Sequence, residues 1–266
     1  MNYLLKFGLE TNPFNKNSQD FKLELSNYKQ LLFRLHHLEE IKGIGLITGE
    51  PGLGKSSAVR YWSNSLNKNL FKVIYIPHST VTVHEFYRDL CEKLGLEESH
   101  SKRKNLNNIQ QEINRLYIEK RITPVIIIDE ANYLASSILN DLKILLNFEM
   151  DSKEPYILLL IGQNIIRNTL NMKSHEPLRQ RISMNYSFEP LSKDEARSYI
   201  DGKLKLAGVN TPLLTEEAYN QIIGSSNGVP RKINQIMDKA LLLLENKKAD
   251  IIDDTIMLDA VEEAEI

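Results

Sequence analysis

One eight-residue segment limits what this chain can fold into more than any other. Residues 49–56 read GEPGLGKS and fit the pattern G-x-x-x-x-G-K-S/T in full. A short apolar run at 44–48 precedes the segment, and a stretch of helical character from 55 to about 66 follows it. A strand, a glycine-rich turn and a helix in this order predict a loop whose backbone N–H groups face phosphate oxygens, with the helix dipole adding to the attraction.

Each residue of this loop has a task in such a site. Lys55 reaches the β- and γ-phosphates of a nucleoside triphosphate, and the hydroxyl of Ser56 is a ligand for Mg²⁺. The predicted nucleotide-binding residues are Gly49, Glu50, Pro51, Gly52, Leu53, Gly54, Lys55, Ser56 and Ser57. We therefore expect a phosphate-rich ligand together with Mg²⁺.

A pair of acids follows a second apolar run. Asp129 and Glu130 come directly after residues 125–128 (VIII), the pattern of a strand buried on both faces of a parallel sheet. Such sheets bind ligands beyond the carboxyl ends of their strands. We expect Asp129 to hold Mg²⁺ through water, and Glu130 to orient or deprotonate the water that attacks the γ-phosphate. Taken alone, the pair would be better interpreted as a solvated acidic turn; with the glycine-rich loop it predicts hydrolysis.

Other patterns complete a parallel α/β fold. Residues 73–76 and 156–161 are strand-like, and alternation over 184–188 predicts a final, partly exposed strand. Helices are predicted over 26–40 and from the capping box at 82–85 (TVHE) to about residue 94. The polar residues 97–108 are predicted to form a loop before an amphipathic helix.

The strand pattern stops near Pro190. A second capping box at 192–195 (SKDE) and helical spacing over 214–223, 230–245 and 254–263 follow it. We therefore expect an α/β domain over residues 1–190, beginning with a leader segment over 1–25, and a small all-helical domain over 191–266.

Composition excludes several classes of protein. The net charge is −2, so any contact with DNA must be local. Cys91 has no second cysteine to pair with, which fits a reducing cytoplasm. Neither a signal peptide nor a run of about eighteen apolar residues is present, so we expect a cytoplasmic protein outside the membrane. No Cys/His spacing resembles a metal site, which leaves Mg²⁺ as the metal that we predict.

The loop, the acid pair after a buried strand and the trailing helices resemble the AAA+ ATPases, and the resemblance covers nearly the whole chain. It narrows to the ExeA-like branch on residues 3–9 (YLLKFGL), Pro13-Phe14, 161–163 (IGQ), 178–182 (LRQRI) and 228–231 (GVPR). That branch includes the ATPase of general-secretion systems and is similar to transposition ATPases of the TnsC, TniB and MuB type. The resemblance implies a P-loop NTPase fold with a parallel sheet between helices, a helical lid domain, and hydrolysis of ATP with Mg²⁺.

The resemblance also implies further site residues. Gln163 occupies the sensor-1 position with Asn164 beside it, although Asn164 is equally interpreted as a helix cap. Arg181, or else Arg179, corresponds to the arginine finger that reaches a neighbouring subunit's nucleotide, the alternative being a surface ion pair. Arg231 fits sensor 2 at the start of a lid helix, where an ordinary first-turn cation would oppose the helix dipole.

Two more sets of residues are candidates with an open alternative. Phe14, with Phe7, is a candidate wall of the adenine pocket, and equally a core residue. In transposition ATPases, loops after the second strand and its helix touch the DNA backbone. By that resemblance the candidate DNA contacts are His78, Ser79, Thr80, Lys102, Arg103 and Lys104, the alternative being a solvated basic loop.

Three functions follow, in order of preference. The first is an ATP-dependent regulator of DNA transposition that forms a ring or helical oligomer on double-stranded DNA and recruits a separate transposase or integrase. The second is an ExeA-type secretion-assembly ATPase; its full-length members continue into a membrane span, and the end of this chain at Ile266 favours the first function. The third is a nucleotide-binding scaffold with little turnover, against which Glu130 argues.

Overall fold

The computed structural model describes residues 9, 11–15, 25–77, 81–209 and 211–265. The chain forms two compact units. The α/β unit comprises Lys29–Pro51 and Lys55–Phe188. The helical unit comprises the described residues up to Tyr28, Gly52–Gly54 and the residues from Glu189 onward. The domain boundary expected near residue 190 stays a prediction.

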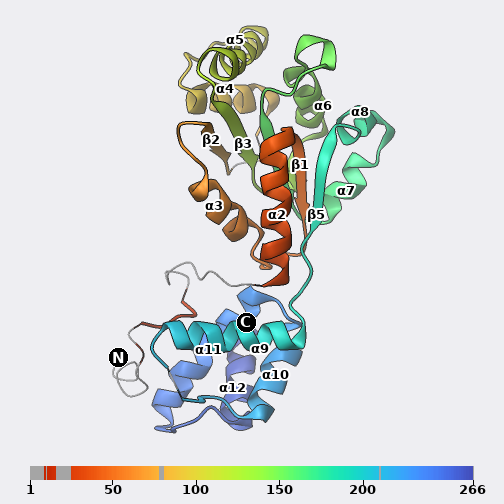
Figure 1. Ribbon diagram of the computed structural model, residues 1–266. Helices are drawn as coiled ribbons and strands as arrows, with labels where there is room; N and C mark the ends of the chain where they lie inside the picture. The colour runs from red at the N-terminus through yellow and green to blue at the C-terminus, as the bar shows by residue number, and fades with distance from the viewer. Residues whose placement is uncertain (1–8, 10, 16–24, 78–80, 210, 266) are drawn as a thin grey trace. The chain divides into compact units, whose positions relative to one another are not determined.

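The α/β unit is built on one parallel sheet of five strands in the order β2-β3-β4-β1-β5 (Figure 1). The strands are β1 (Gly43–Thr48), β2 (Phe71–Ile76), β3 (Thr123–Ile128), β4 (Ile157–Gly162) and β5 (Ile182–Ser187). The three central strands are buried along their whole length, and the two edge strands are partly exposed. The continuous apolar runs identify the central strands for this reason, and the predicted parallel α/β fold is confirmed.

Helices cover both faces of the sheet. The helices that precede β5 in the chain are α2 (Ser26–Ile41), α3 (Lys55–Ser65), α4 (Val83–Leu94), α5 (Lys102–Asn114), α6 (Ser136–Leu145), α7 (Ile165–Leu170) and α8 (Glu176–Arg179). Ile44 and Leu46 share a core cluster with residues of α4, α5 and α6. On the opposite face, a Cβ atom at Gly45 would come within 3.0 Å of Leu38 of α2. Successive β1 residues therefore face different helices, as the period of a strand requires.

The prediction of a loop over residues 97–108 is confirmed for residues 97–101 and wrong for residues 102–108, which are helical. Helix α5 already begins at Lys102, with Ser101 as its N-cap: the Ser101 hydroxyl accepts a hydrogen bond from the backbone N–H of Lys104 at 3.4 Å. Asn105 is fully buried. Its side-chain oxygen accepts the backbone N–H of Ser99, and its Nδ2 donates to the carbonyl oxygen of Ser99. A side-chain cap and one buried amide thus outweigh the polar composition that suggested a loop.

The helical unit holds α9 (Lys193–Leu206), α10 (Glu216–Ser226), α11 (Pro230–Asn246) and α12 (Asp254–Ala264). Both predicted capping boxes are confirmed: Thr82 and Glu85 begin α4, and Ser192 and Glu195 begin α9. In each, the hydroxyl and the carboxylate satisfy two backbone N–H groups that the first helical turn leaves open.

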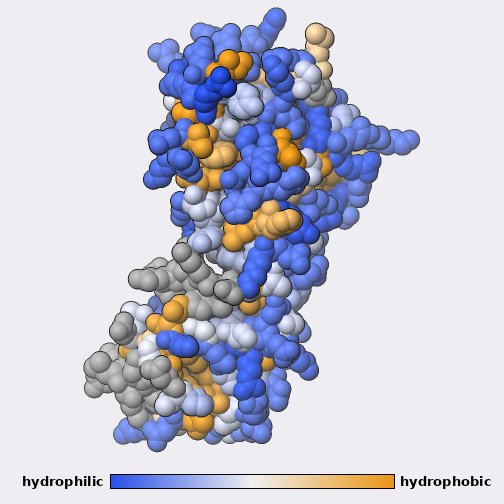
Figure 2. Space-filling model, in the orientation of Figure 1, coloured by the Kyte–Doolittle hydropathy of each residue, from blue (hydrophilic) through white to orange (hydrophobic). Residues whose placement is uncertain are grey.

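The surface is largely hydrophilic on the face shown in Figure 2, as expected for a chain in which 26% of the residues are charged. On the face drawn in Figure 2, hydrophilic residues predominate and the apolar ones form small separate groups. Within the described ranges, no helix is both long and apolar enough to cross a membrane.

Candidate nucleotide site

The glycine-rich loop connects β1 to α3. Gly52 and Gly54 have φ angles of +85° and +96°, in the left-handed region where an L side chain is strained. Lys55 is buried, and its Nζ donates hydrogen bonds to the carbonyl oxygens of Gly49 at 2.8 Å and Glu50 at 2.9 Å. The loop therefore holds the lysine ammonium at its own backbone, at the N-terminus of α3, where phosphate oxygens are stabilised.

Asp129 lies at the carboxyl end of β3 with both carboxylate oxygens engaged. Oδ1 accepts the backbone N–H of Glu130 at 2.9 Å, and Oδ2 accepts the hydroxyl of Tyr75 at 3.0 Å. Tyr75 comes from β2, the strand paired with β3. Burial, and next the charge of Asp129, raise the pKa of Tyr75 to about 12, so the phenol stays protonated and donates at neutral pH.

Tyr75 is not among the site residues expected from the sequence. The sequence places Tyr75 in the strand that precedes β3, so its hydroxyl could have been expected near the acid pair if β2 and β3 were assumed to be neighbours. Tyrosine is common in β-strands, so by strand propensity alone Tyr75 is an ordinary strand residue.

Glu130 is exposed and has an unusual backbone conformation. Its φ is +51° and its ψ is +39°, a left-handed geometry that costs a non-glycine residue on the order of 1–3 kcal/mol. The carbonyl of Glu130 accepts the backbone N–H of Tyr133 at 3.0 Å, so a 3-10 turn, Ala131–Tyr133, follows at once. Because Glu130 also follows the buried Asp129 at the carboxyl end of β3, its strained conformation motivates the hypothesis that this turn is functional.

The chemistry of the donors fits Mg²⁺. The residues expected to hold the ion, Ser56 and Asp129, offer hydroxyl and carboxylate oxygens, the hard donors that Mg²⁺ prefers when phosphates supply further ligands. Within the described part of the chain, no cluster of three or more His, Cys, Asp or Glu side chains forms a metal site.

Gln163 and Asn164, the two residues after β4, contact the turn after β3 and the loop after β1. The backbone N–H of Gln163 donates to Oδ1 of Asn132 at 2.9 Å, and Nδ2 of Asn164 donates to Oε1 of Glu50 at 3.3 Å. The alternative interpretation of Asn164 as a helix cap is confirmed for its position: Asn164 is the N-cap residue of α7, although its side chain makes no capping hydrogen bond. Asn132, too, is not among the site residues expected from the sequence.

The two candidate finger arginines differ in their contacts. Nη1 of Arg181 donates to the carbonyl of Lys143 at 3.0 Å, in the last turn of α6. Arg179 lies in α8 with its side chain 46% exposed, near Glu176 and donating to Oδ1 of Asn171 at 3.1 Å. Arg181 thus stabilises its own α/β unit, and Arg179 has more surface available to a neighbour.

The two candidates of the helical unit lie in different surroundings. Arg231 is in the first turn of α11, and its backbone N–H donates to the carbonyl of Gly52 at 3.2 Å, within the same unit. Phe14 is buried in the hydrophobic core of the helical unit. Its contribution to an adenine pocket and the sensor-2 role of Arg231 stay predictions, and Phe7 lies outside the described residues.

The basic cluster is the first turn of α5. Nζ of Lys102 lies 2.6 Å from Oδ2 of Asp141 in α6 and 5.7 Å from the centre of the Tyr87 ring. Arg103 and Lys104 are exposed. The other candidate DNA contacts, His78, Ser79 and Thr80, lie outside the described residues.

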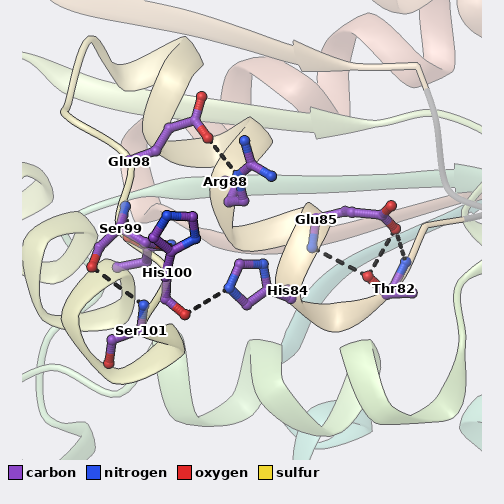
Figure 3. Close-up of polar contacts among 9 residues, drawn as sticks. Thr82, His84, Glu85, Arg88, Glu98, Ser99, His100 and Ser101 are labelled. Atoms are coloured by element: carbon purple, nitrogen blue, oxygen red, sulfur yellow. Dashed lines mark hydrogen bonds and ion pairs between the residues drawn. The ribbon is translucent and has the colours of Figure 1, made fainter.

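Polar contacts fix the turn that leads into α5 (Figure 3). Nε2 of His84 lies 2.9 Å from the carbonyl of His100, and Arg88 pairs with Glu98. The side chains of His84 and Arg88, which lie near the basic cluster, therefore contact groups of this same chain.

A family model for the AAA domain matches residues 38–170, half of the chain. General secretion pathway protein A of Aeromonas hydrophila is 30% identical over 245 residues, which cover 90% of this chain and 44% of that protein. An uncharacterized HTH-type transcriptional regulator of Methanocaldococcus jannaschii is 26% identical over 306 residues, 96% of this chain and 73% of that protein. The chain thus spans less than half of the length of its secretion-pathway relative.

Solved structures share the fold. Cdc6p of Pyrobaculum aerophilum aligns with a TM-score of 0.69 at 18% identity, over 90% of this chain and 67% of that one. ORC1 of Aeropyrum pernix in complex with DNA aligns with a TM-score of 0.67 at 14% identity, over 94% and 68%. The RuvB branch migration motor of Thermotoga maritima aligns with a TM-score of 0.62 at 20% identity, over 94% and 72%. At these identities the likeness concerns the fold alone.

Proposed function

We propose that this chain, which belongs to the AAA domain family, binds Mg-ATP and hydrolyses it to ADP and phosphate. One observation carries the proposal: the loop with Lys55 and the acid pair Asp129-Glu130 follow β1 and β3 of the same parallel sheet, with only β4 between these strands. Ligands of open parallel sheets bind at this carboxyl edge.

The residues divide the work. Lys55 binds the β- and γ-phosphates, and Tyr75 holds the carboxylate of Asp129 in one orientation. Glu130 orients the attacking water from its strained turn. Mg²⁺, held through Ser56 and Asp129, neutralises negative charge on the phosphates when it is bound.

Loss of Lys55 and loss of Glu130 are expected to differ. Lys55→Ala removes the cation that binds the phosphates, so ATP affinity falls at least about tenfold. Glu130→Gln keeps shape and binding but removes the base, so kcat falls about 100-fold or more with affinity retained. Phosphate release and binding of a fluorescent ATP analogue measure the two effects, with the exposed Glu92→Gln as the matched control.

Tight ATP binding without turnover in the wild-type protein would contradict the hydrolysis proposal and favour the nucleotide-binding scaffold. Equal turnover in Glu130→Gln and wild type would remove Glu130 from the mechanism while leaving the nucleotide site in place.

For the biological process we propose energy supply to a secretion apparatus, the second of the three functions. The support is the 30% identity to General secretion pathway protein A over 90% of this chain. Because the chain spans only 44% of that relative, the position of Ile266 does not decide between the functions. Transposition, the first of the three functions, rests on the resemblance to transposition ATPases and on the basic cluster, and Lys102 of that cluster pairs with Asp141.

The two processes separate in a pair of experiments. In the source organism, loss of the gene is expected to reduce export of secreted proteins, with rescue by wild type and no rescue by Glu130→Gln. In solution, we expect wild type and the double variant Arg103→Ala/Lys104→Ala to bind double-stranded DNA equally weakly, with or without an ATP analogue, across a salt series. Normal export, together with ATP-dependent DNA binding that the double variant loses, would reverse the assignment.

A further inference from the structure

A side chain from the turn after β3 contacts the end of the neighbouring strand. Asn132 Oδ1 accepts the backbone N–H of Gln163 at 2.9 Å, across 31 residues of sequence. The bond is partly buried, so water competes for it less than at an open surface. It joins the segment after the acid pair to the first residue beyond β4.

The glycine at 162 allows this approach. A Cβ atom at Gly162 would lie 2.7 Å from Oδ1 of Asn132 and 3.1 Å from its backbone nitrogen. A larger residue at 162 would displace the Asn132 side-chain oxygen and crowd the backbone of its turn. The contact between Asn132 and Gln163 therefore depends on a glycine at position 162 as well as on the amide at position 132.

Asn132 is rigidly connected to Glu130. The Tyr133 N–H bonds the Glu130 carbonyl at 3.0 Å, and the Leu134 N–H bonds the Ala131 carbonyl at 3.1 Å. These two hydrogen bonds close a 3-10 turn that directly follows the left-handed Glu130. A displacement of Asn132 would change the direction of the Glu130 side chain.

The far side of the contact reaches the phosphate loop. Asn164 bonds Glu50 at 3.3 Å, and Gly162 lies opposite Thr48 in the pairing of β4 with β1. A continuous set of polar contacts thus crosses the carboxyl ends of β3, β4 and β1. Its members are joined by two hydrogen bonds, Asn132 to Gln163 and Asn164 to Glu50, and by the peptide bond between Gln163 and Asn164.

We propose that Asn132 is a positioning residue for ATP hydrolysis: through Gln163 and Asn164 it fixes the Glu130 turn relative to the phosphate loop. This rests on the proposed function. Asn132 acts through Glu130 and has no contact with substrate in the mechanism. Misplacing a reacting group by about 1 Å lowers a rate up to about 100-fold, so the contact matters for kcat more than for ATP affinity.

Matched variants isolate the hydrogen bond. Asn132→Leu keeps the size of the side chain and removes the acceptor, whereas Asn132→Asp keeps an acceptor oxygen in the same place. Asn140→Leu, at an exposed position of α6, controls for the same chemical change elsewhere. We expect Asn132→Leu to lower kcat about tenfold or more with KM for ATP within about threefold, and Asn132→Asp and Asn140→Leu to stay within about threefold of wild type.

A second measurement needs no turnover. Amide hydrogen exchange at Gln163 is expected to accelerate about tenfold or more in Asn132→Leu and to stay slow in Asn132→Asp. If wild type proves inactive, the hydrolysis proposal fails and unchanged kcat carries no weight, but Gln163 exchange still decides whether Asn132 fixes the turn. Asn132→Ala, with the same expectation, replaces the leucine variant should that variant fail to fold.

The inference is overturned by unchanged kcat in Asn132→Leu beside an active wild type, by equal loss in Asn132→Leu and Asn132→Asp, or by Gln163 exchange that is the same in all variants. A rise in KM without a fall in kcat also overturns it, because positioning of Glu130 acts on the chemical step.

Discussion

Lys203 carries a cationic group into the interior of the helical unit. Its Nζ donates to the carbonyl of Pro13 at 2.8 Å and to Oδ1 of Asn234 at 3.2 Å, and it lies 5.4 Å and 5.3 Å from the rings of Phe14 and Tyr199. Burial lowers the pKa of Lys203 from 10.5 to about 8. The described part of the leader is thus attached to the C-terminal helices through a lysine that loses its proton unusually easily.

The stability of the helical unit is therefore expected to depend on pH. Between pH 8 and 10.5 the unfolded chain keeps the Lys203 proton more readily than the folded one, so the free energy of unfolding rises with pH in this window. The contribution is at most about 3 kcal/mol. Urea unfolding at several pH values, for wild type and Lys203→Met, measures it as a difference that grows with pH.

Lys205→Met, at an exposed position two residues on, should show a difference that does not vary with pH. If Lys203→Met behaves in the same way, burial does not lower the pKa of Lys203 in the folded protein.

At the scale of elements, the ion pair between Lys102 and Asp141 joins α5 to α6. The side chain of Asp141 is only 11% exposed, whereas that of Lys102 is 47% exposed. Removing the lysine leaves a poorly solvated carboxylate, although solvent at Lys102 screens part of the loss.

Lys102→Ala is therefore expected to lower the free energy of unfolding by about 1–2 kcal/mol. Arg103→Ala, one position along the same helical turn, should change it by less than about 0.5 kcal/mol. Chemical denaturation compares them, and equal small effects would mean that Lys102 is a surface cation available to a partner.

At the scale of the whole molecule, the arginines of residues 178–182 bear on assembly. Because Arg181 bonds the end of α6 while Arg179 is more exposed, we expect Arg179 to act on the nucleotide of a second copy. Arg179→Ala should then lower kcat about 1,000-fold, as loss of a finger does, and Arg181→Ala should mainly lower stability.

Mixing two inactive variants tests action between copies. Arg179→Ala subunits keep Glu130, and Glu130→Gln subunits keep Arg179, so a mixed oligomer contains some sites with both groups. Phosphate release in the mixture above the sum of the separate variants is the expected result. Additive rates would place the arginine's action within one subunit or remove it from the reaction.

The local patterns in the sequence determined most of the helices and strands and carry the chemistry that we expect of the site. Some patterns depend only on neighbours within a few residues and can therefore be recognised in the sequence. They are the apolar runs of β1, β3 and β4, the two capping boxes and the glycine-rich loop. The roles expected of Lys55 and Asp129 depend likewise on the motif around each residue.

Tertiary structure alone decided the contacts between segments distant in sequence. The strand order β2-β3-β4-β1-β5 brings Tyr75 to Asp129 and Asn132 to Gln163, pairs 54 and 31 residues apart. Folding also made Lys102 a partner of Asp141 and set Phe14 in the helical core. A sequence pattern records which side chains are available and in what local conformation; which of them meet depends on how the strands order and the helices pack, and many distant residues determine that together.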